Sequence, residues 1–174
     1  MQTIIRRATS SDADGIACVH VESWQSTYPG ILPEETLGNL SIENRAKAWQ
    51  KTLQNLPEDH CIVVCENQNE IVGFACGGPE RGMHADYSGE VYAIYILEKA
   101  QGLGNGQRML QSVAQSLLDS GFDSMLIWVA KENDSRFFYE AMGGLAVAEK
   151  SIEIHGTRVE EVGFGWLDVR SILE

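Results

Sequence analysis

The residues best suited to chemistry form a glycine-rich turn at residues 101–106, Gln-Gly-Leu-Gly-Asn-Gly, which follows an apolar run at 91–97 and a short charged turn at 98–100. After the turn, apolar side chains recur at helical spacing: Met109, Leu110, Val113, Ala114, Leu117 and Leu118. Glycine lets the backbone turn sharply and approach a ligand closely. A helix that starts at such a turn presents free N–H groups and the positive end of its dipole. The stretch therefore predicts a site for an anion such as a phosphate.

The spacing of the glycines decides which phosphate group fits. The dinucleotide fingerprint G-x-G-x-x-G and the P-loop G-x-x-x-x-G-K-S/T both need a glycine where, counted from Gly102, the chain has Gln107. The pattern Q/R-x-x-G-x-G/A does fit, at Gln101, Gly104 and Gly106. Behind an apolar strand, this pattern resembles the acyl-CoA pyrophosphate loop of the GNAT N-acetyltransferase superfamily. On the loop alone, a glycine-rich turn without a ligand remains the alternative.

A second motif, AKENDSRFFYEAMGG at residues 130–144, is similar to the N-x-x-A-x-x-x-Y-E-x-x-G-F block of the same superfamily. The matching residues are Asn133, Phe138, Tyr139, Glu140 and Gly143. Asn133 precedes Tyr139 by one position fewer than is common in the family, and Gly144 replaces the usual phenylalanine. The N-terminal SWQSTYPGILP also resembles one bacterial branch. The resemblance spans essentially the whole chain and implies a single N-acetyltransferase domain, residues 1–174.

The spacing of apolar residues and the positions of proline and glycine along the chain predict the order β-α-α-β-β-β-α-β-α-β-β in one layered α/β domain. We expect strands at 3–7, 61–65, 70–77, 90–97, 124–129, 145–154 and 158–169. We expect helices at 13–24, 42–56, 104–119 and 133–142, and a loop or short helical turn at 31–39. The sheet should be mixed and mostly antiparallel, with helices on both faces and one parallel βαβ unit in the middle. This order matches the GNAT fold.

The resemblance implies acetyl-CoA as co-substrate, with the pantetheine against the splayed end of the strand at 90–97 and the pyrophosphate on the loop amides. The cofactor-binding residues that it implies are Ile94, Tyr95, Ile96, Gln101, Gly102, Leu103, Gly104, Asn105, Gly106, Gln107 and Asn133. A strand amide can also polarise the thioester carbonyl.

Acyl transfer to an amine needs a base that removes the proton of the amine. The family often carries a glutamate at the start of the loop-bearing strand, which here is Glu90. An exposed carboxylate at a strand end is the alternative for this residue. His84, Asp86 and Glu22 are rivals for the same role.

The departing thiolate needs an acid, and the motif places Tyr139 in that role. A thiol has a pKa of about 8.5 and a phenol of about 10, so a tyrosine is protonated at neutral pH and close enough in acidity to donate. An aromatic core residue beside Phe137 and Phe138 is the alternative. Trp24 and Tyr28 lie where the family's first two helices meet, beside the acceptor pocket, although Trp24 also suits core packing.

Composition narrows the function further. The chain has 174 residues, a formal net charge of −12 and a pI near 4.7, which argues against nucleic acid and anionic membranes as partners. Its four cysteines contain no C-x-x-C pair and no zinc-ligand spacing, so we expect no metal and reduced thiols in a cytoplasmic protein. A small-molecule or peptide amine is the expected acceptor, and a homodimer and a monomer are both open.

The sequence thus predicts an N-acetyltransferase that moves the acetyl group of acetyl-CoA to a primary amine by direct transfer in a ternary complex. A non-catalytic acyl-CoA-binding or sensing module is the main alternative, since it would keep the loop and lose the acid and base. An oxidoreductase on a dinucleotide fold is a weaker one, because the third glycine is missing.

Overall fold

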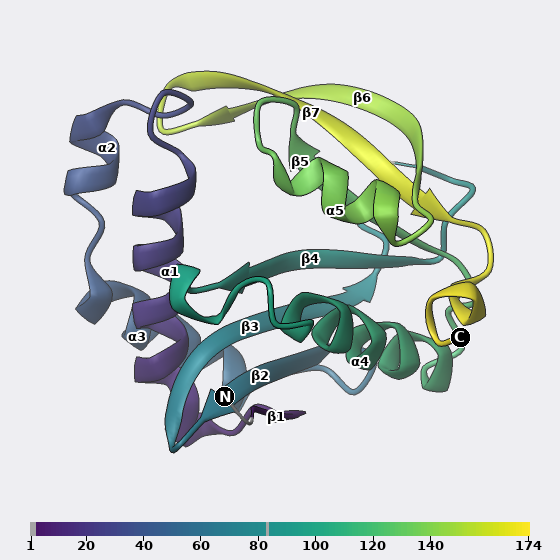
Figure 1. The fold of residues 1–174 in the computed structure, drawn as a ribbon, viewed down its shortest axis with the longest axis horizontal. Coiled ribbons are helices and arrows are strands. Elements are labelled where there is room, and N and C mark those ends of the chain that lie inside the picture. The colour runs from purple at the N-terminus through teal and green to yellow at the C-terminus, as the bar shows by residue number, and fades with distance from the viewer. Residues whose placement is uncertain (1–2, 83) are drawn as a thin grey trace.

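The computed structural model describes residues 3–82 and 84–174. Its strands are β1 (Ile4–Arg7), β2 (Cys61–Asn67), β3 (Glu70–Pro79), β4 (Gly89–Ile96), β5 (Met125–Ala130), β6 (Leu145–Ile154) and β7 (Thr157–Trp166). Its helices are α1 (Ala13–Thr27), α2 (Glu34–Gly38), α3 (Ile42–Gln54), α4 (Asn105–Asp119) and α5 (Ser135–Ala141). Figure 1 shows how these elements are arranged.

The strands form one sheet in the order β1-β2-β3-β4-β5-β7-β6. Strands β4 and β5 are parallel, and every other pair of neighbours in this order is antiparallel. The predicted α/β class, the mixed sheet and the central parallel β4-α4-β5 unit are confirmed. The apolar run predicted to be buried on both faces, residues 61–65, is buried throughout in β2.

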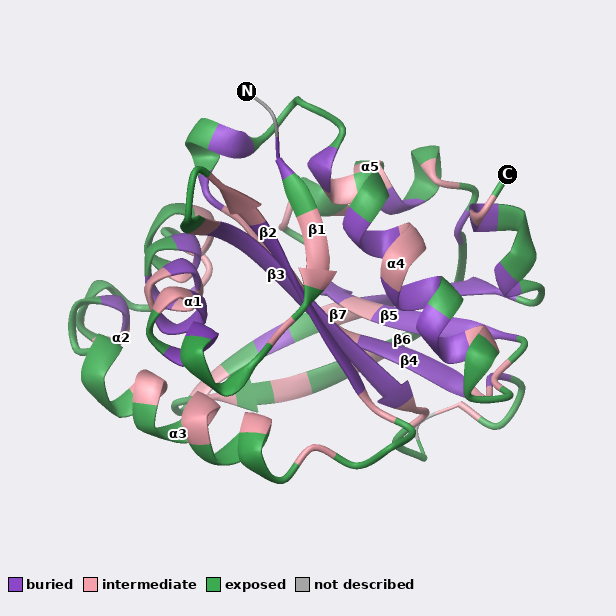
Figure 2. Ribbon diagram, turned by 90° about the horizontal axis from the view of Figure 1, so that it is seen from below, coloured by how far each residue is buried: buried purple, intermediate pink, exposed green. Residues whose placement is uncertain are grey.

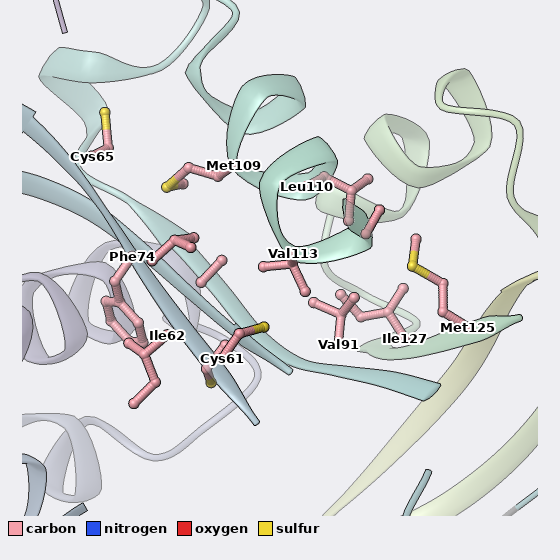
Figure 3. Packing of buried hydrophobic residues seen from close by; sticks show 14 of the residues in the cluster. Cys61, Ile62, Cys65, Phe74, Val91, Met109, Leu110, Val113, Met125 and Ile127 are labelled. Carbon is pink, nitrogen blue, oxygen red and sulfur yellow. The ribbon is translucent and has the colours of Figure 1, made fainter. Parts of the chain in front are cut away.

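Helix α4 covers one face of the sheet through the predicted apolar stripe. Five side chains of the stripe are almost fully buried: Met109, Leu110, Val113, Ala114 and Leu117. Figure 3 shows Val113 and Leu110 pointing toward the strands that carry Val91 and Ile127. This packing fixes the start of α4, and with it the glycine-rich turn, against strand β4.

Helices α1 and α3 cover the opposite face. Ile16 and Ala17 of α1 are buried against the sheet, and the ring of Trp49 on α3 meets the ring of Phe74 on β3 edge-on at 5.1 Å. Figure 2 shows the buried residues concentrated on the central strands and on the helix surfaces that face them. The sheet therefore has helices on both faces, as predicted.

Strand β4 carries a β-bulge at Tyr92. Here Ala93 pairs with Cys76 of β3 while Val91 pairs with Gly77, so Tyr92 is the extra residue. A bulge bends its strand and interrupts pairing. On the other side of β4, the pairing with β5 ends at Val91, and β5 continues against β7 instead (Figure 1). The part of β4 beyond the bulge therefore has one edge without a strand partner.

Some boundaries differ from the prediction for local reasons. The helix predicted from residue 133 begins at Ser135, and the side chain of Asn133 accepts a hydrogen bond from the Ser135 amide at 2.9 Å in the turn before the helix. The last strand ends at Trp166, and a turn at Val169–Ile172 follows, where Asp168 caps the amide of Arg170 at 3.0 Å.

Candidate active site

The turn before α4 has the backbone geometry of an anion site. Gly102 and Gly104 adopt left-handed φ values of 71° and 76°, and a Cβ atom added to either would meet no heavy atom within 4 Å. The backbone N–H groups of residues 102–107 donate to no acceptor in residues 3–82 and 84–174, and Arg108 is the first to do so, bonding the Gly104 carbonyl at 3.2 Å. Adjacent unpaired amides at a helix start fit a pyrophosphate.

Hydrogen bonds from two of its own side chains hold the glycine-rich turn in place. Gln101 donates to the carbonyl of Ile96 at 2.9 Å. The buried side chain of Asn105 donates to the carbonyl of Ala100 at 2.9 Å and accepts from the hydroxyl of Thr3 at 2.6 Å. Because the Asn105 side chain points into the protein, its predicted contact with the cofactor is limited to its backbone amide.

The open edge of β4 meets the turn and helix α5 at one place. Ile94, Tyr95 and Ile96 are all half-buried. A Cβ on Gly106 would lie 3.4 Å from both Ile96 and Phe138, so the strand edge, the turn and α5 converge there. The predicted pantetheine and pyrophosphate residues are thus brought together, with the side chain of Leu103 52% exposed beside them.

Three tyrosines gather beside the split between β4 and β5. Tyr28, at the end of α1, lies close enough to Tyr95 and Asn133 for both side chains to affect its pKa, and burial raises that pKa. Burial also raises the pKa of Tyr95 well above its ordinary value. Burial, with a smaller contribution from Tyr28, raises the pKa of Tyr139. All three phenols therefore carry their protons at neutral pH. Asn133, whose role the sequence left open, thus lies near Tyr28, just before the start of α5.

The side chain of Tyr139 packs in the core, and its phenol is protonated at neutral pH. It is 4% exposed, and its ring centroid lies 5.2 Å from that of Phe138 and 6.1 Å from that of Phe164. Its phenol faces the group formed by Tyr28 and Tyr95 closely enough for Tyr28 to affect its pKa. The packing fixes the ring, so the proton is held at a defined place beside the split.

Glu90 is 1% exposed and is held by Arg81. The Arg81 backbone amide donates to one carboxylate oxygen at 3.2 Å, its Nε lies 3.2 Å from both oxygens, and its Nη2 donates to Oε1. The guanidinium also lies 4.4 Å above the ring of Tyr92. The alternative of an exposed carboxylate at a strand end therefore does not apply.

Sequence reasoning missed Arg81. It lies in a polar stretch, residues 78–82, without a strand or helix period that would predict where its side chain points. The sequence could have predicted that Tyr92 lies near Glu90. Alternate residues of a strand share a face, and Tyr92 comes two positions after Glu90.

The rival bases, His84, Asp86 and Glu22, lie apart from the pair formed by Glu90 and Arg81. His84 packs edge-on against Tyr87 at 5.1 Å, with its Nδ1 3.8 Å from the carboxylate of Asp86. The Asp86 side chain is 78% exposed. Glu22 is exposed and lines a separate polar hollow with Arg6 and Asp12.

Trp24 and Tyr28, which the resemblance places beside the acceptor pocket, pack together with ring centroids 5.0 Å apart. The neighbouring His20 stacks on Tyr95 at 5.6 Å and accepts a hydrogen bond from the Trp49 indole at 3.1 Å. Burial, with a contribution from the charge of Arg45, lowers the pKa of His20 to about 4, so this imidazole is neutral at neutral pH.

The described part of the chain gives little support for a metal site, a disulfide bond or a membrane-spanning helix. Its His, Cys, Asp and Glu side chains form no group of three or more that could hold a metal ion. All four cysteines are free thiols. Within residues 3–82 and 84–174, no helix combines the length and the apolar character that a bilayer crossing requires.

Replacing Gly104 with valine is expected to weaken CoA binding about tenfold or more, the loss of one or two charge-assisted hydrogen bonds. Its φ of 76° disfavours any side chain, and the new Cβ would occupy the open space above the amides. Gly121→Val is the matched control, because Gly121 has a φ of 89° and equally open surroundings at the far end of α4. Calorimetric titration with CoA checks this: equal affinity in folded Gly104→Val and Gly121→Val would remove the cofactor from this turn.

Comparison with known proteins agrees with this geometry. The sequence model of the acetyltransferase (GNAT) family matches residues 21–144. The uncharacterized N-acetyltransferase YuaI of Bacillus subtilis is 38% identical over 169 residues, which cover 97% of this chain and 95% of YuaI.

Two solved structures share the fold. The PaiA N-acetyltransferase of Thermoplasma acidophilum, in complex with coenzyme A, aligns with a TM-score of 0.66 at 20% identity, covering 93% of this chain and 98% of its own. The Salmonella typhimurium protein yncA, with its cofactor acetyl-CoA, aligns with a TM-score of 0.71 at 18% identity. The alignment covers 97% of this chain and 95% of yncA. Since the family's sequence pattern and a full-length relative agree with the loop and the sheet described above, the chain belongs to the acetyltransferase (GNAT) family and is an acetyl-CoA-dependent acyltransferase.

Proposed function

We propose that the enzyme transfers the acetyl group directly to a primary amine while amine and acetyl-CoA are bound together. One observation carries this proposal. A single strand, β4, runs from the buried carboxylate of Glu90, past the bulge at Tyr92, along an unpaired edge, to the turn with the unpaired amides. Base, reaction centre and phosphate site would then lie along one rigid element, which is the kind of positioning that accelerates a reaction between two bound molecules.

When bound, acetyl-CoA supplies the acetyl group as a thioester. The amides of residues 102–107 would hold its pyrophosphate, and the backbone of Ile94–Ile96 would pair with its pantetheine. Asn133 would contribute from the α5 side, where it lies close enough to Tyr28 to affect its pKa. The unpaired backbone groups of this edge need partners, which supports the pairing.

Glu90 is the proposed base. It would take the proton of the ammonium, directly or through a water, so that the nitrogen lone pair can form the new C–N bond. For this, Arg81 must move off the carboxylate. The Arg81 side chain is 58% exposed, so it can swing into solvent without disturbing the core. A hydrogen bond seen without substrate does not exclude a residue from catalysis.

Tyr139 is the proposed acid. As the C–S bond breaks, its phenol would give a proton to the sulfur, so that the products are the N-acetyl amine and the free thiol. Burial raises the pKa of Tyr139, so the phenol keeps its proton before transfer and is a weaker acid than the sequence alone predicts. Trp24 and Tyr28 would lie beside the acceptor pocket, where the Trp24 ring packs 5.7 Å from the ring of His20.

A non-catalytic acyl-CoA-binding module is the second candidate. The observation that favours it is the hold of Arg81 on Glu90, which occupies the proposed base. A screen of primary amines with acetyl-CoA, following release of free thiol, separates the two. Thiol release that depends on an amine supports the enzyme, whereas tight CoA binding with no release by any amine supports the module.

A further inference from the structure

A cavity of about 270 Å³ lies between α3 and the sheet, on the face opposite α4. Trp49 and Leu56 form its outer wall, Ile62 of β2 lies on its floor, and His20 and Tyr92 line it as well. At about 30 Å³ per water molecule, this volume equals that of roughly nine waters. It therefore suits a small molecule rather than a peptide or an aminoglycoside.

The walls of the cavity offer burial and few hydrogen bonds. Apart from the Arg45 guanidinium, its main polar groups already have partners: the Tyr92 hydroxyl donates to the Pro79 carbonyl at 2.6 Å, and His20 accepts from Trp49 at 3.1 Å. His60 pairs with Asp59 at 2.8 Å. Within residues 3–82 and 84–174, no carboxylate lines the cavity. A ligand would thus be held mainly by burial of its apolar surface.

One residue that lines the cavity, Tyr92, also contacts the group that holds the proposed base. The Tyr92 ring lies under the guanidinium of Arg81, 4.4 Å away, and that guanidinium rests on the Glu90 carboxylate. A buried carboxylate beside an aromatic face is a site for a cation. Arg81 occupies this cation position in the structure, and a substrate ammonium can take its place.

We infer that the acceptor is a monoamine with a compact apolar body, either a short alkyl chain or a single aromatic ring. Its ammonium replaces the Arg81 guanidinium on Glu90, and its body fills the cavity. This inference rests on the proposed function. A second ammonium would find no carboxylate among the described lining residues and would face the positive charge of Arg45. Burying such a charge unpaired is costly, so the site rejects diamines and longer polyamines.

An isosteric pair of amines tests the inference. In putrescine an ammonium replaces the terminal methyl group of n-pentylamine, and the chains are otherwise equal in length. We expect kcat/KM for n-pentylamine to exceed that for putrescine about tenfold or more, with phenethylamine also accepted. Equal values, or a preference for putrescine, would overturn the inference and leave acetyl transfer intact.

A variant that fills the cavity provides a second test of the inference. Ala48 lines the cavity from an exposed position on α3, so Ala48→Phe reduces its volume with little risk to the fold. Lys51→Phe adds the same ring to α3 at an exposed residue outside the lining. We expect Ala48→Phe, and not Lys51→Phe, to raise the KM for n-pentylamine about tenfold while CoA affinity is unchanged. An unchanged KM in Ala48→Phe would contradict the inference.

Calorimetric titration of n-pentylamine into the CoA-bound protein separates this inference from the proposed function. If n-pentylamine binds and Ala48→Phe weakens its binding, but no amine is acetylated, then the proposed function fails and the binding site stands. If some other amine is acetylated and n-pentylamine does not bind, the inference fails and the proposed function stands.

Discussion

Replacing Glu90 with glutamine is expected to lower kcat/KM by about 10²–10⁴-fold, the usual contribution of a general base. Glutamine keeps the size of the side chain and can still accept from Arg81, so the fold should persist. Because the amide cannot take the proton of the ammonium, only amine that has already lost its proton in solution can react, so the loss in kcat/KM should be largest at low pH. Steady-state kinetics across pH, with CoA affinity measured alongside, checks both effects.

The rivals for the role of base supply the controls. His84→Gln and Asp86→Asn change groups that lie close to each other, with His84 Nδ1 3.8 Å from Asp86, and that make no contact with the Glu90 carboxylate in the described hydrogen bonds. Both should keep the wild-type pH profile. A wild-type profile in Glu90→Gln would move the role to His84, Asp86, Glu22 or bulk solvent.

Replacing Tyr139 with phenylalanine is expected to lower kcat about 10²-fold or more while the protein stays folded and binds acetyl-CoA with its normal affinity. The change keeps the ring between Phe138 and Phe164 and removes only the hydroxyl. Because burial raises the pKa of Tyr139, the wild-type acid stays protonated up to alkaline pH, and the loss should therefore be similar from neutral pH to about pH 9.

Tyr95→Phe is the matched control, since Tyr95 belongs to the same group of tyrosines and its hydroxyl interacts with Tyr28. It should reduce turnover much less. If Tyr139→Phe melts at a lower temperature but turns over at the wild-type rate, Tyr139 is a packing residue and the thiolate leaves unassisted or with the help of another acid.

The features that the sequence predicted well are those set by local pattern. The apolar stripe from Met109 to Leu117 predicted both the helix and its buried face, because helix period alone decides which side chains meet the sheet. The glycines at 102 and 104 predicted a turn, and both adopt left-handed φ angles. The resemblance of the two motifs to the GNAT superfamily added the family, which local pattern does not reveal.

What the sequence left open depends on contacts between distant segments. Asn105 fits the loop motif, yet its side chain binds Thr3, which is 102 residues away. The bulge at Tyr92 arises from the pairing of β4 with β3, and no spacing in the sequence predicts it. The partnership of Arg81 with Glu90 depends on how the segment after β3 folds back over the sheet.

The fate of the acetyl group tests the central claim most directly. In a rapid-quench experiment with acetyl-CoA labelled in the acetyl group, the account predicts one N-acetyl amine for each free thiol, and only when an amine is present. Intact-protein mass spectrometry of the same samples should show no acetyl group on the enzyme, because transfer occurs within one ternary complex. Thiol release at the same rate without an amine, or an acetylated protein that then passes its label to the amine, would contradict the account.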